Sequence, residues 1–332
     1  MLNLPLVSVI IPCRNEEKFI ASCLNSIIVN NYPKEDLEVL IVDGMSEDRT
    51  REIIKKYVEK YLFIKILDNP KKYTPFALNI GIKNSRGEII IRMDAHSTYE
   101  KDYIKKCVKY LESYKADNVG GIWKIIPREN TFIAKAISFA SASFFGAGNA
   151  YYRSGYSKGV KWVDTVFGGC YRRKIFDKVG FFNENLIRSQ DMEFNLRLKK
   201  MGGRILLVPD IVSYYYPKAD LKDFFLHNFQ DGIWAIYPLK FIKTPLSLRH
   251  YIPFIFVLSL LITALLGIFS PLFLRFFLAI SGFYLLTALC FSIEITVKEK
   301  NIVFLFLMPI VFIARHIGYG LGSILGALKL IV

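Results

Sequence analysis

The sequence predicts an α/β protein with a mostly parallel, Rossmann-like sheet, followed by C-terminal transmembrane helices. Two observations support this prediction. Short apolar runs of strand length alternate with helical patterns over the first two thirds of the chain, which is typical of a doubly wound parallel sheet. Three long stretches with almost no charged residues occupy the last third, and each has about the length that a membrane span requires.

The composition agrees with a protein of two parts. The 332 residues are 52% hydrophobic and carry a formal net charge of +15, and the mean hydropathy is +0.30. A basic, apolar chain favours anionic lipid head groups or phosphorylated substrates. We expect no nucleic-acid partner, because the sequence has no zinc spacing, basic zipper or RNP-like pattern. The five cysteines are scattered without a C-x-x-C pair, which indicates reduced thiols in a cytosolic domain.

The expected strands and helices can be placed in order along the first 235 residues. Fully apolar, β-branched runs predict the strands, and apolar positions at helical spacing predict the helices between them. Asn15 and Ser46 each precede a helical pattern, so we expect both to act as N-caps. The predicted strands lie at 6–11, 37–42, 62–67, 88–93 and 205–208, with another inside 162–171, and the later predicted helices cover 75–84, 104–111 and 191–201.

The last third of the chain predicts a membrane domain, 252–332. Its three expected transmembrane helices lie at about 252–270, 272–293 and 302–328. Lysine and arginine precede the first span and follow the second, whereas the turn between them is uncharged. The positive-inside bias therefore predicts a multi-pass plasma-membrane protein with a cytoplasmic N-terminal domain, 1–235, and an external C-terminus.

Three further segments are assigned relative to the membrane. Residues 236–251 are expected to form a juxtamembrane, interfacial segment, and the apolar stretch 132–145 is expected to lie against the membrane surface. Arg315 and His316 interrupt the third predicted span. They mark either a polar path or packing against the other helices.

The run from Glu88 to His96 ends an apolar strand with an acidic residue, one spacer and a histidine. Side chains two positions apart on an extended segment point the same way, so Asp94 and His96 can converge on one point. That point lies at the carboxyl end of a strand, where open α/β sheets bind ligands. A carboxylate and an imidazole together suit Mg²⁺ or Mn²⁺, and a polar turn after the strand is the simpler alternative.

Five motifs follow one another along residues 5–235. They are V-S-V-I-I-P-C-R-N-E (7–16), V-D-G-M-S-E-D-R-T (42–50), A-L-N-I-G-I (77–82), D-A-H (94–96) and S-Q-D-M-E-F-N-L-R-L (189–198). In this order and spacing the chain resembles the family 2 inverting glycosyltransferases, which have the GT-A fold. The D-A-H form, the Q-D-M-E-F motif and the three spans most resemble bacterial enzymes of succinoglycan-type exopolysaccharide assembly. Those enzymes transfer a sugar from a nucleotide donor to a lipid-linked glycan.

The resemblance implies a donor side built from three segments. Pro12, Arg14 and Glu16 match the positions that hold the nucleoside, with Glu16 near the ribose. Asp43 matches the carboxylate that reads the uracil edge. Asn79 lies in the segment that contacts the nucleotide and sugar, where many relatives have an arginine before the asparagine and this chain has a leucine.

The resemblance also implies a metal site and a base. Asp94 and His96 match the metal-binding motif, whose usual form is D-x-D, so a neutral imidazole replaces one carboxylate ligand. The implied cofactor is a divalent cation, Mg²⁺ or Mn²⁺. Asp191 matches the catalytic base that takes the proton of the acceptor hydroxyl. It stands at the start of a predicted helix, whose positive end is expected to keep the carboxylate ionised.

Four residues are assigned to the acceptor side. Gly168 and Gly169 match a loop beside the acceptor, and Gln190 precedes the predicted base within its motif. Trp234 closes a Q-D-G-I-W sequence similar to the Q-x-x-R-W motif of processive synthases, although isoleucine replaces the arginine. Trp234 either contributes to acceptor binding or anchors an interfacial helix.

These assignments predict a metal-dependent transferase that moves a hexose from a nucleotide sugar, UDP by the resemblance, to a polyprenyl-diphosphate-linked glycan. One alternative enzyme places a single sugar on polyprenyl monophosphate. A processive polysaccharide synthase is disfavoured by the missing arginine of Q-x-x-R-W and by the small number of spans. A non-catalytic sugar-nucleotide sensor or membrane scaffold is disfavoured because Asp94 and Asp191 are both present.

Overall fold

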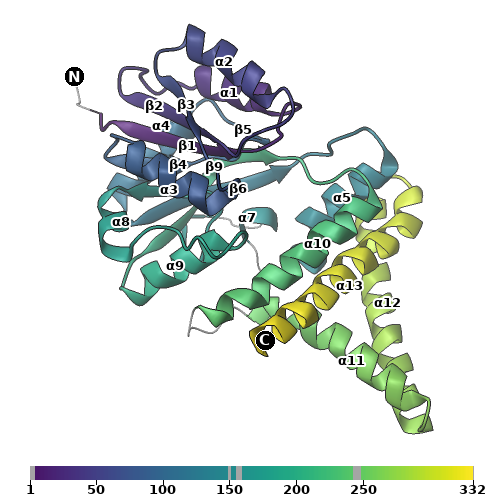
Figure 1. Cartoon of the computed structure of the whole chain (residues 1–332). Helices are drawn as coiled ribbons and strands as arrows, with labels where there is room; N and C mark the ends of the chain where they lie inside the picture. The colour runs from purple at the N-terminus through teal and green to yellow at the C-terminus, as the bar shows by residue number, and fades with distance from the viewer. Residues whose placement is uncertain (1–3, 149–150, 155–158, 242–247, 332) are drawn as a thin grey trace. The chain divides into compact units, whose positions relative to one another are not determined.

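The computed structural model describes residues 4–148, 151–154, 159–241 and 248–331. The chain divides into two compact units, whose elements are drawn in Figure 1. The first unit comprises Met1–Lys124 and Gly155–Tyr215, and the second comprises Ile125–Ser154 and Tyr216–Val332. The second unit therefore combines a segment from the middle of the chain with the C-terminal helices. Part of the predicted juxtamembrane segment, 242–247, lies outside the described residues.

The first unit is built around one sheet. Its described strands are β1 Val7–Cys13, β2 Leu37–Asp43, β3 Ile64–Asp68, β4 Ile89–Arg92, β5 Ser97–Tyr99, β6 Asn118–Ile125, β7 Lys161–Val163, β8 Cys170–Arg172 and β9 Ile205–Tyr215. Their order is β3-β2-β1-β4-β8-β6-β9-β5, with β7 beside β9. The first four strands are parallel, whereas β8 runs antiparallel to β4 and β6, and β9 to β5 and β7. The predicted parallel α/β fold is confirmed, and the added antiparallel strands make the whole sheet mixed.

Helices cover this sheet because their apolar positions recur at helical spacing. In α1 (Ile20–Ile28) the buried residues are Ile20, Cys23, Leu24 and Ile27, which form one continuous stripe. Nearly every residue of β1, β2 and β4 is buried, as expected for strands with helices on both faces. The other helices of this unit are α2 Thr50–Lys60, α3 Thr74–Asn84, α4 Tyr103–Ser113, α8 Lys174–Val179 and α9 Gln190–Lys200.

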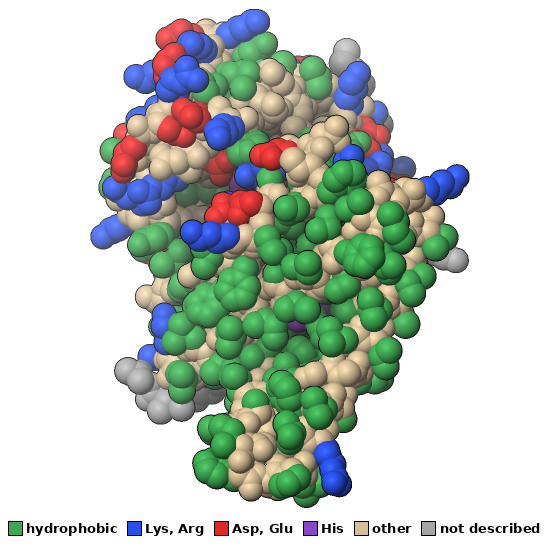
Figure 2. Space-filling view, turned by 90° about the vertical axis from the view of Figure 1, so that its right-hand side faces the viewer, with side chains coloured by type: hydrophobic (Ala, Val, Ile, Leu, Met, Phe, Trp, Pro, Cys, Tyr) green, Lys and Arg blue, Asp and Glu red, His purple; other side chains and the backbone are tan. Residues whose placement is uncertain are grey.

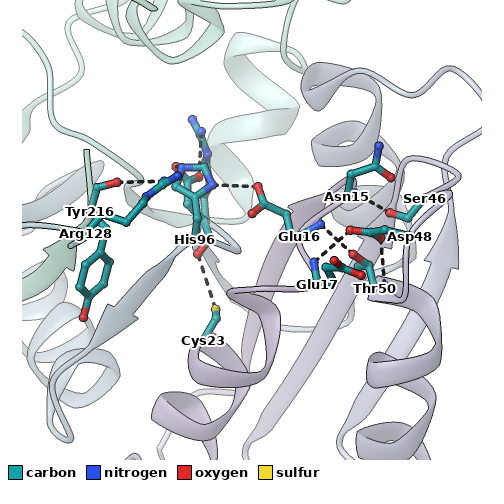
Figure 3. Close-up of polar contacts among 12 residues, drawn as sticks. Asn15, Glu16, Glu17, Cys23, Ser46, Asp48, Thr50, His96, Arg128 and Tyr216 are labelled. Atoms are coloured by element: carbon teal, nitrogen blue, oxygen red, sulfur yellow. Dashed lines mark hydrogen bonds and ion pairs between the residues drawn. The ribbon is translucent and has the colours of Figure 1, made fainter. Parts of the chain in front are cut away.

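Neither Asn15 nor Ser46 caps the helix that follows it, so that prediction is wrong. The N-cap residues of α1 and α2 are Phe19 and Arg49, and neither makes a side-chain capping hydrogen bond. Instead, the Asn15 backbone N–H donates to Ser46 Oγ at 2.9 Å (Figure 3), and Asn15 Oδ1 accepts from Glu47 N at 2.9 Å. The two side chains bind the loops after β1 and β2 to each other, and this tertiary pairing replaces the local caps.

The second unit is a set of apolar helices. They are α5 Phe132–Ala142, α6 Phe144–Ala147, α7 Tyr151–Ser154, α10 Leu221–Ile236, α11 Ile252–Gly267, α12 Pro271–Glu299 and α13 Val303–Ile331, with 3₁₀ turns at Tyr237–Lys240 and Leu248–His250. Figure 1 shows α10 running alongside α13. Gly318, Gly322 and Gly326 of α13 face α10, where an added Cβ would overlap the α10 backbone. Small residues thus permit the close approach, as in many membrane helix pairs.

In the described part of this unit, two helices are long and apolar enough to cross a membrane: Pro271–Glu299 and Val303–Leu330. The helix α11 is apolar as well, but its 16 residues extend only about 24 Å, against a hydrocarbon core of roughly 30 Å. A span at 252–270 therefore stays a prediction. Figure 2 shows hydrophobic side chains over much of the face turned toward the viewer, with few charged groups in the lower part of the view.

Arg315 and His316 contact the short helix α6 within the second unit. Arg315 Nε donates to the Gly146 carbonyl at 2.5 Å, and His316 Nε2 lies 3.0 Å from the Phe145 carbonyl oxygen. His316 Nδ1 also lies 2.9 Å from the hydroxyl of Tyr284. Carbonyls at a helix end need such partners where water is scarce. Of the two alternatives left open by the sequence, these contacts support packing between helices.

Asn195 gives a test of how α9 is held in the first unit. Its fully buried side chain donates from Nδ2 to Thr165 Oγ1 at 2.9 Å and accepts from Asn118 Nδ2 at 2.9 Å. Asn195→Leu keeps the number and branching of the side-chain heavy atoms and removes both bonds, so we expect the free energy of unfolding to fall by about 2 to 4 kcal/mol. The exposed Lys199→Gln on the same helix should change it by less than about 0.5 kcal/mol. Urea unfolding followed by tryptophan fluorescence measures both, and equal stability of the two variants would contradict the expectation.

Candidate active site

Three parallel strands, β1, β2 and β4, end at the same edge of the sheet. Cys13 pairs with Asp43 in the register of β1 and β2, and Ile10 pairs with Arg92 in that of β1 and β4. The chain passes from β1 to β2 and β3 on one side and places β4 on the other, so β1 and β4 flank a reversal of strand order. Open α/β sheets bind ligands at such a switch point.

Asp43 ends β2 with its carboxylate buried and held from two sides. Its Oδ2 accepts from Arg51 Nη1 at 2.6 Å and from Ser46 N at 3.0 Å, and its Oδ1 accepts from Ser46 Oγ at 2.5 Å. Arg51 also pairs with Asp68 at 2.7 Å. The structure thus presents a fixed hydrogen-bond acceptor at the end of β2. That Asp43 binds the edge of the uracil base stays a prediction.

The residues predicted to hold the nucleoside lie at the end of β1 and in the loop after it. Pro12 is half-buried in β1, and Arg14 lies at the surface with Nη2 3.7 Å from Glu47 Oε1. The carboxylate of Glu16 turns toward His96, with 2.9 Å between Oε1 and Nδ1 (Figure 3). The predicted ribose-side residue and the predicted metal ligand are therefore direct neighbours.

His96 joins the Glu16 carboxylate to the carboxylate of Asp94. When the ring is neutral, the bond to Glu16 requires the proton on Nδ1 and leaves the lone pair on Nε2. His96 Nε2 lies 3.9 Å from Asp94 Oδ2. Asp94 Oδ2 is an oxygen ligand of the kind that hard divalent cations prefer, and the imidazole Nε2 is a nitrogen ligand that suits divalent transition metals. The bond to Glu16 orients the ring. Within the described residues, no group of three or more His, Cys, Asp or Glu side chains forms a complete metal site.

Arg92, the last residue of β4, connects the two halves of the site. Its Nη2 lies 3.0 Å from Asp94 Oδ1, and its Nη1 forms a second ion pair with Asp191 Oδ1. The side chains are 8% exposed for Arg92, 12% for Asp94 and 18% for Asp191. The structure therefore brings the predicted metal ligand and the predicted base onto one buried guanidinium.

Arg92 is a site residue that the sequence reasoning missed. The signal was present, because a cation directly follows three isoleucines and stands two residues before Asp94. On an extended segment that spacing puts the side chains of Arg92 and Asp94 on the same side. A buried arginine also requires a counter-ion, but the sequence does not reveal that the second counter-ion comes from Asp191.

Asp191 lies in the first turn of α9, after Ser189 in a left-handed conformation (φ 59°). Burial raises the pKa of Asp191 above its usual range, and the Arg92 guanidinium opposes that rise. The helix terminus was expected to favour the ionised form, but desolvation outweighs the favourable charges. A carboxylate with a raised pKa is a stronger proton acceptor than an ordinary aspartate once it is ionised.

Three of the four residues predicted for the acceptor side lie beside this ion pair in the first unit. Gly168 and Gly169 both have positive φ, 71° and 94°, and the Gly169 carbonyl accepts from Arg92 N at 3.0 Å. A Cβ at Gly169 would overlap the ring of Tyr171. Gln190 is buried next to Asp191, and its Oε1 has no hydrogen-bond partner among the described residues. Their contact with an acceptor stays a prediction.

Two predicted site residues make other contacts. Asn79 is buried on α3, where Nδ2 donates to the Phe182 carbonyl and to Glu184 Oε1, both at 2.9 Å. It therefore holds the segment that precedes α9, and its contact with a donor stays a prediction. Trp234 lies on α10 in the second unit, where its ring meets that of Tyr237 edge-on at 5.4 Å between centroids.

Comparison with known sequences identifies relatives along the whole chain. The chain is 32% identical, over 97% of its length and 97% of the relative's, to the dolichyl N-acetyl-alpha-D-glucosaminyl phosphate 3-beta-D-2,3-diacetamido-2,3-dideoxy-beta-D-glucuronosyltransferase of Methanococcus voltae. It is 31% identical to the succinoglycan biosynthesis protein ExoA of Rhizobium meliloti, over 68% of this chain and 67% of that protein.

Solved structures share the fold at lower identity. The mannosyltransferase PcManGT of Pyrobaculum calidifontis, in complex with GDP-Man and Mn²⁺, superposes with a TM-score of 0.60 at 20% identity, over 96% of this chain and 88% of that chain. The TarS protein of S. aureus with UDP-GlcNAc gives a TM-score of 0.51 at 16% identity, over 97% and 92%.

The family assignment rests on the sequence itself, because residues 8–180 match the family described as Glycosyl transferase family 2. That range contains β1 except its first residue, then β2 to β4, and it includes Glu16, Asp43, Asp94 and His96. Together with the full-length relative and the shared fold, this shows that the chain belongs to glycosyltransferase family 2 and has a GT-A-like fold.

Proposed function

We propose that this glycosyltransferase moves a hexose from a UDP-sugar to a sugar already linked to a polyprenyl phosphate or diphosphate, with inversion at the anomeric carbon. The observation that carries the proposal is the pair of carboxylates, Asp94 and Asp191, on the single guanidinium of Arg92. One carboxylate then serves the departing phosphate side and the other serves the incoming hydroxyl. The two roles require these groups within one site.

The relatives support the choice of acceptor and donor. The relative from Methanococcus voltae is named for a dolichyl-phosphate-linked sugar acceptor, and ExoA is named for succinoglycan biosynthesis. A lipid-linked sugar is therefore favoured over free polyprenyl monophosphate. Structural neighbours hold GDP-Man in one case and UDP-GlcNAc in another, so the preference for UDP rests on the motif that contains Asp43.

The reaction is a direct displacement. Asp191 takes the proton of the acceptor hydroxyl while that oxygen bonds to the anomeric carbon, and the bond from that carbon to the diphosphate breaks on the opposite face. One base and one displacement invert the configuration. Burial, which raises the pKa of Asp191, matches its proton affinity more closely to this task.

A divalent cation fits the donors at the end of β4. Asp94 Oδ2 and His96 Nε2 lie 3.9 Å apart and would hold it. Two protein ligands suit a cation whose other positions are filled by substrate phosphates and water. When bound, the cation would supply charge stabilisation for the leaving diphosphate. The mannosyltransferase with the same fold contains Mn²⁺.

We further propose that the enzyme is a multi-pass protein of the plasma membrane with its catalytic unit in the cytoplasm. The apolar helices Pro271–Glu299 and Val303–Leu330 support a membrane location, and the basic residues around the spans support the orientation. The helix α5 adds Phe132 and Ile133, which are 48% and 42% exposed. Such residues suit contact with lipid.

Asp191→Asn tests the function. The amide keeps the shape but does not accept a proton, so we expect sugar transfer to fall by about 100-fold or more, whereas UDP binding stays within about twofold of the unchanged protein. Transfer is measured with radiolabelled UDP-hexoses and native membrane lipids, followed by product analysis. Asp177→Asn, an exposed carboxylate on α8, is the matched control and should retain full transfer.

Three outcomes would revise the proposal. Transfer by Asp191→Asn at the unchanged rate would remove Asp191 as the base. A product that carries one sugar on polyprenyl monophosphate would favour the alternative acceptor. Binding of UDP-sugars by the unchanged protein, without transfer to any lipid fraction, would favour a non-catalytic sensor or scaffold.

Asp94→Ala tests the metal assignment. Removal of a charged ligand should weaken UDP binding in Mn²⁺ by about tenfold or more, since loss even of a group that supports a metal ligand has an effect of that order. In EDTA the variant and the unchanged protein should bind UDP alike. Titration calorimetry measures both conditions. Equal binding in Mn²⁺ would show that Asp94 is not a ligand.

The pH dependence of transfer tests the protonation state of Asp191. The base must be ionised, so kcat/KM is lost as the pH falls through its pKa. Because burial raises that pKa, we expect the acidic limb of the profile above about pH 4, the ordinary value for aspartate. Circular dichroism at each pH separates loss of activity from unfolding. An acidic limb at or below about pH 4 in folded protein would contradict the assignment.

A further inference from the structure

Arg92 occupies a position that the proposed reaction does not by itself explain. It is a buried cation at the end of β4, and its two terminal nitrogens are both used, one for Asp94 and one for Asp191. Its backbone belongs to the sheet, where Arg92 pairs with Ile10 in the ladder. Removal of an arginine from water costs free energy unless fixed partners compensate for the lost hydration. The burial of Arg92 therefore calls for a functional explanation.

Arg92 makes further contacts besides those with its two carboxylate partners. The Arg92 backbone N–H donates to Gly169 O at 3.0 Å, and Gly168 leaves room for the strand end, because a Cβ there would lie 3.1 Å from the Arg92 carbonyl oxygen. The guanidinium carbon lies 5.4 Å from the centre of the Phe167 ring, which adds a cation–π contact. Arg92 is therefore fixed by the sheet, by a glycine turn and by an aromatic face.

Asp191 depends on longer-range support. It follows the segment 180–189, which contains no helix or strand, and it is preceded by Ser189 at positive φ. The helix α9 is anchored through Asn195, which donates to Thr165, and through Arg197, which donates to the Phe181 carbonyl. Those contacts fix the helix, whereas the direction of the Asp191 carboxylate is set by its bond to Arg92.

We propose that Arg92 is a positioning residue, which holds the Asp191 carboxylate in a fixed relation to Asp94 through one planar guanidinium. The proposal rests on the proposed function. By engaging Asp191 Oδ1, Arg92 leaves Oδ2 as the oxygen that takes the acceptor proton. The same plane engages Asp94 Oδ1 and leaves Oδ2 on the side of His96. The predicted base, Asp191, and the predicted metal ligand, Asp94, are then aligned by one side chain of the central sheet.

A lysine does not replace this function. Its ammonium is a single point charge, whereas arginine presents two terminal nitrogens in a rigid fork that reaches two carboxylates at once. The charge is therefore not the decisive property. Arg92→Lys preserves the charge and removes the fork, and Arg92→Gln removes both.

The test compares kcat with KM in Arg92→Lys and Arg92→Gln. A displaced base lowers kcat by an amount on the order of 100-fold per ångström, so we expect kcat to fall by about tenfold or more in Arg92→Lys and further in Arg92→Gln. The KM for the UDP-sugar and the affinity for UDP should change less than about threefold, because Glu16 follows β1 and Asp43 ends β2, so neither belongs to β4. The matched controls are Arg172→Lys and Arg172→Gln. Arg172 ends the neighbouring strand β8 and pairs with Glu112 at 2.6 Å, and its variants should keep kcat within about twofold.

A double-mutant cycle separates positioning from general damage. If Arg92 acts through Asp191, the kcat loss of R92K/D191E should be clearly smaller than the product of the losses in R92K and D191E. A kcat loss in R92K/D191E equal to the product of the two single losses would overturn the proposal. So would a kcat of R92K within about threefold of that of the unchanged protein. If Arg92→Gln fails to fold, Arg92→Lys and the cycle decide. Failure of Asp191→Asn to lower transfer would sink the proposed function, whereas full kcat in R92K sinks only this inference.

Discussion

The ion pairs of Arg92 are the contacts on which the candidate site depends. The two carboxylates come from opposite halves of the catalytic unit, one directly after a central strand and one at the start of a helix near the end of the domain. Two aspartates placed together without a cation would repel each other, and one of them would take up a proton. The shared guanidinium permits both to lie near each other in a largely dry environment. Its own position is fixed because parallel strands in register bring their ends to one edge of the sheet.

Much of the fold follows from local sequence pattern. The β-branched runs that form β1, β2 and β4 are long enough and apolar enough to be recognised, and the apolar stripe of α1 is regular. The sequence analysis missed β6, although it has eight residues, and β5, β7 and β8 were less visible because they have only three residues each. A strand of that length has no periodicity of its own, and its pairing with distant neighbours decides its structure.

The site was predictable where a motif lies within one segment. Asp94 and His96 are two residues apart, and their proximity was predicted from the geometry of an extended strand, although β4 ends at Arg92 and residues 95–96 form a turn. The bond between His96 and Glu16, and the bond between Arg92 and Asp191, join segments far apart in the chain. Asn15 and Ser46 illustrate the converse case, since each has a plausible local role as a cap and loses it to a tertiary contact. A single sequence does not show when a contact with a distant segment will replace a local helix cap.

The second unit draws on two separate stretches of chain, 125–154 and 216–332, and this has a consequence for biosynthesis. The rings of Phe139 and Phe145 rest on Phe304 and Phe312, which leave the ribosome long after them. Throughout that interval the apolar stretch 132–147 is without its final partners. A cell must shelter it from water during translation, and a polypeptide ended before α13 would carry the same uncovered surface permanently.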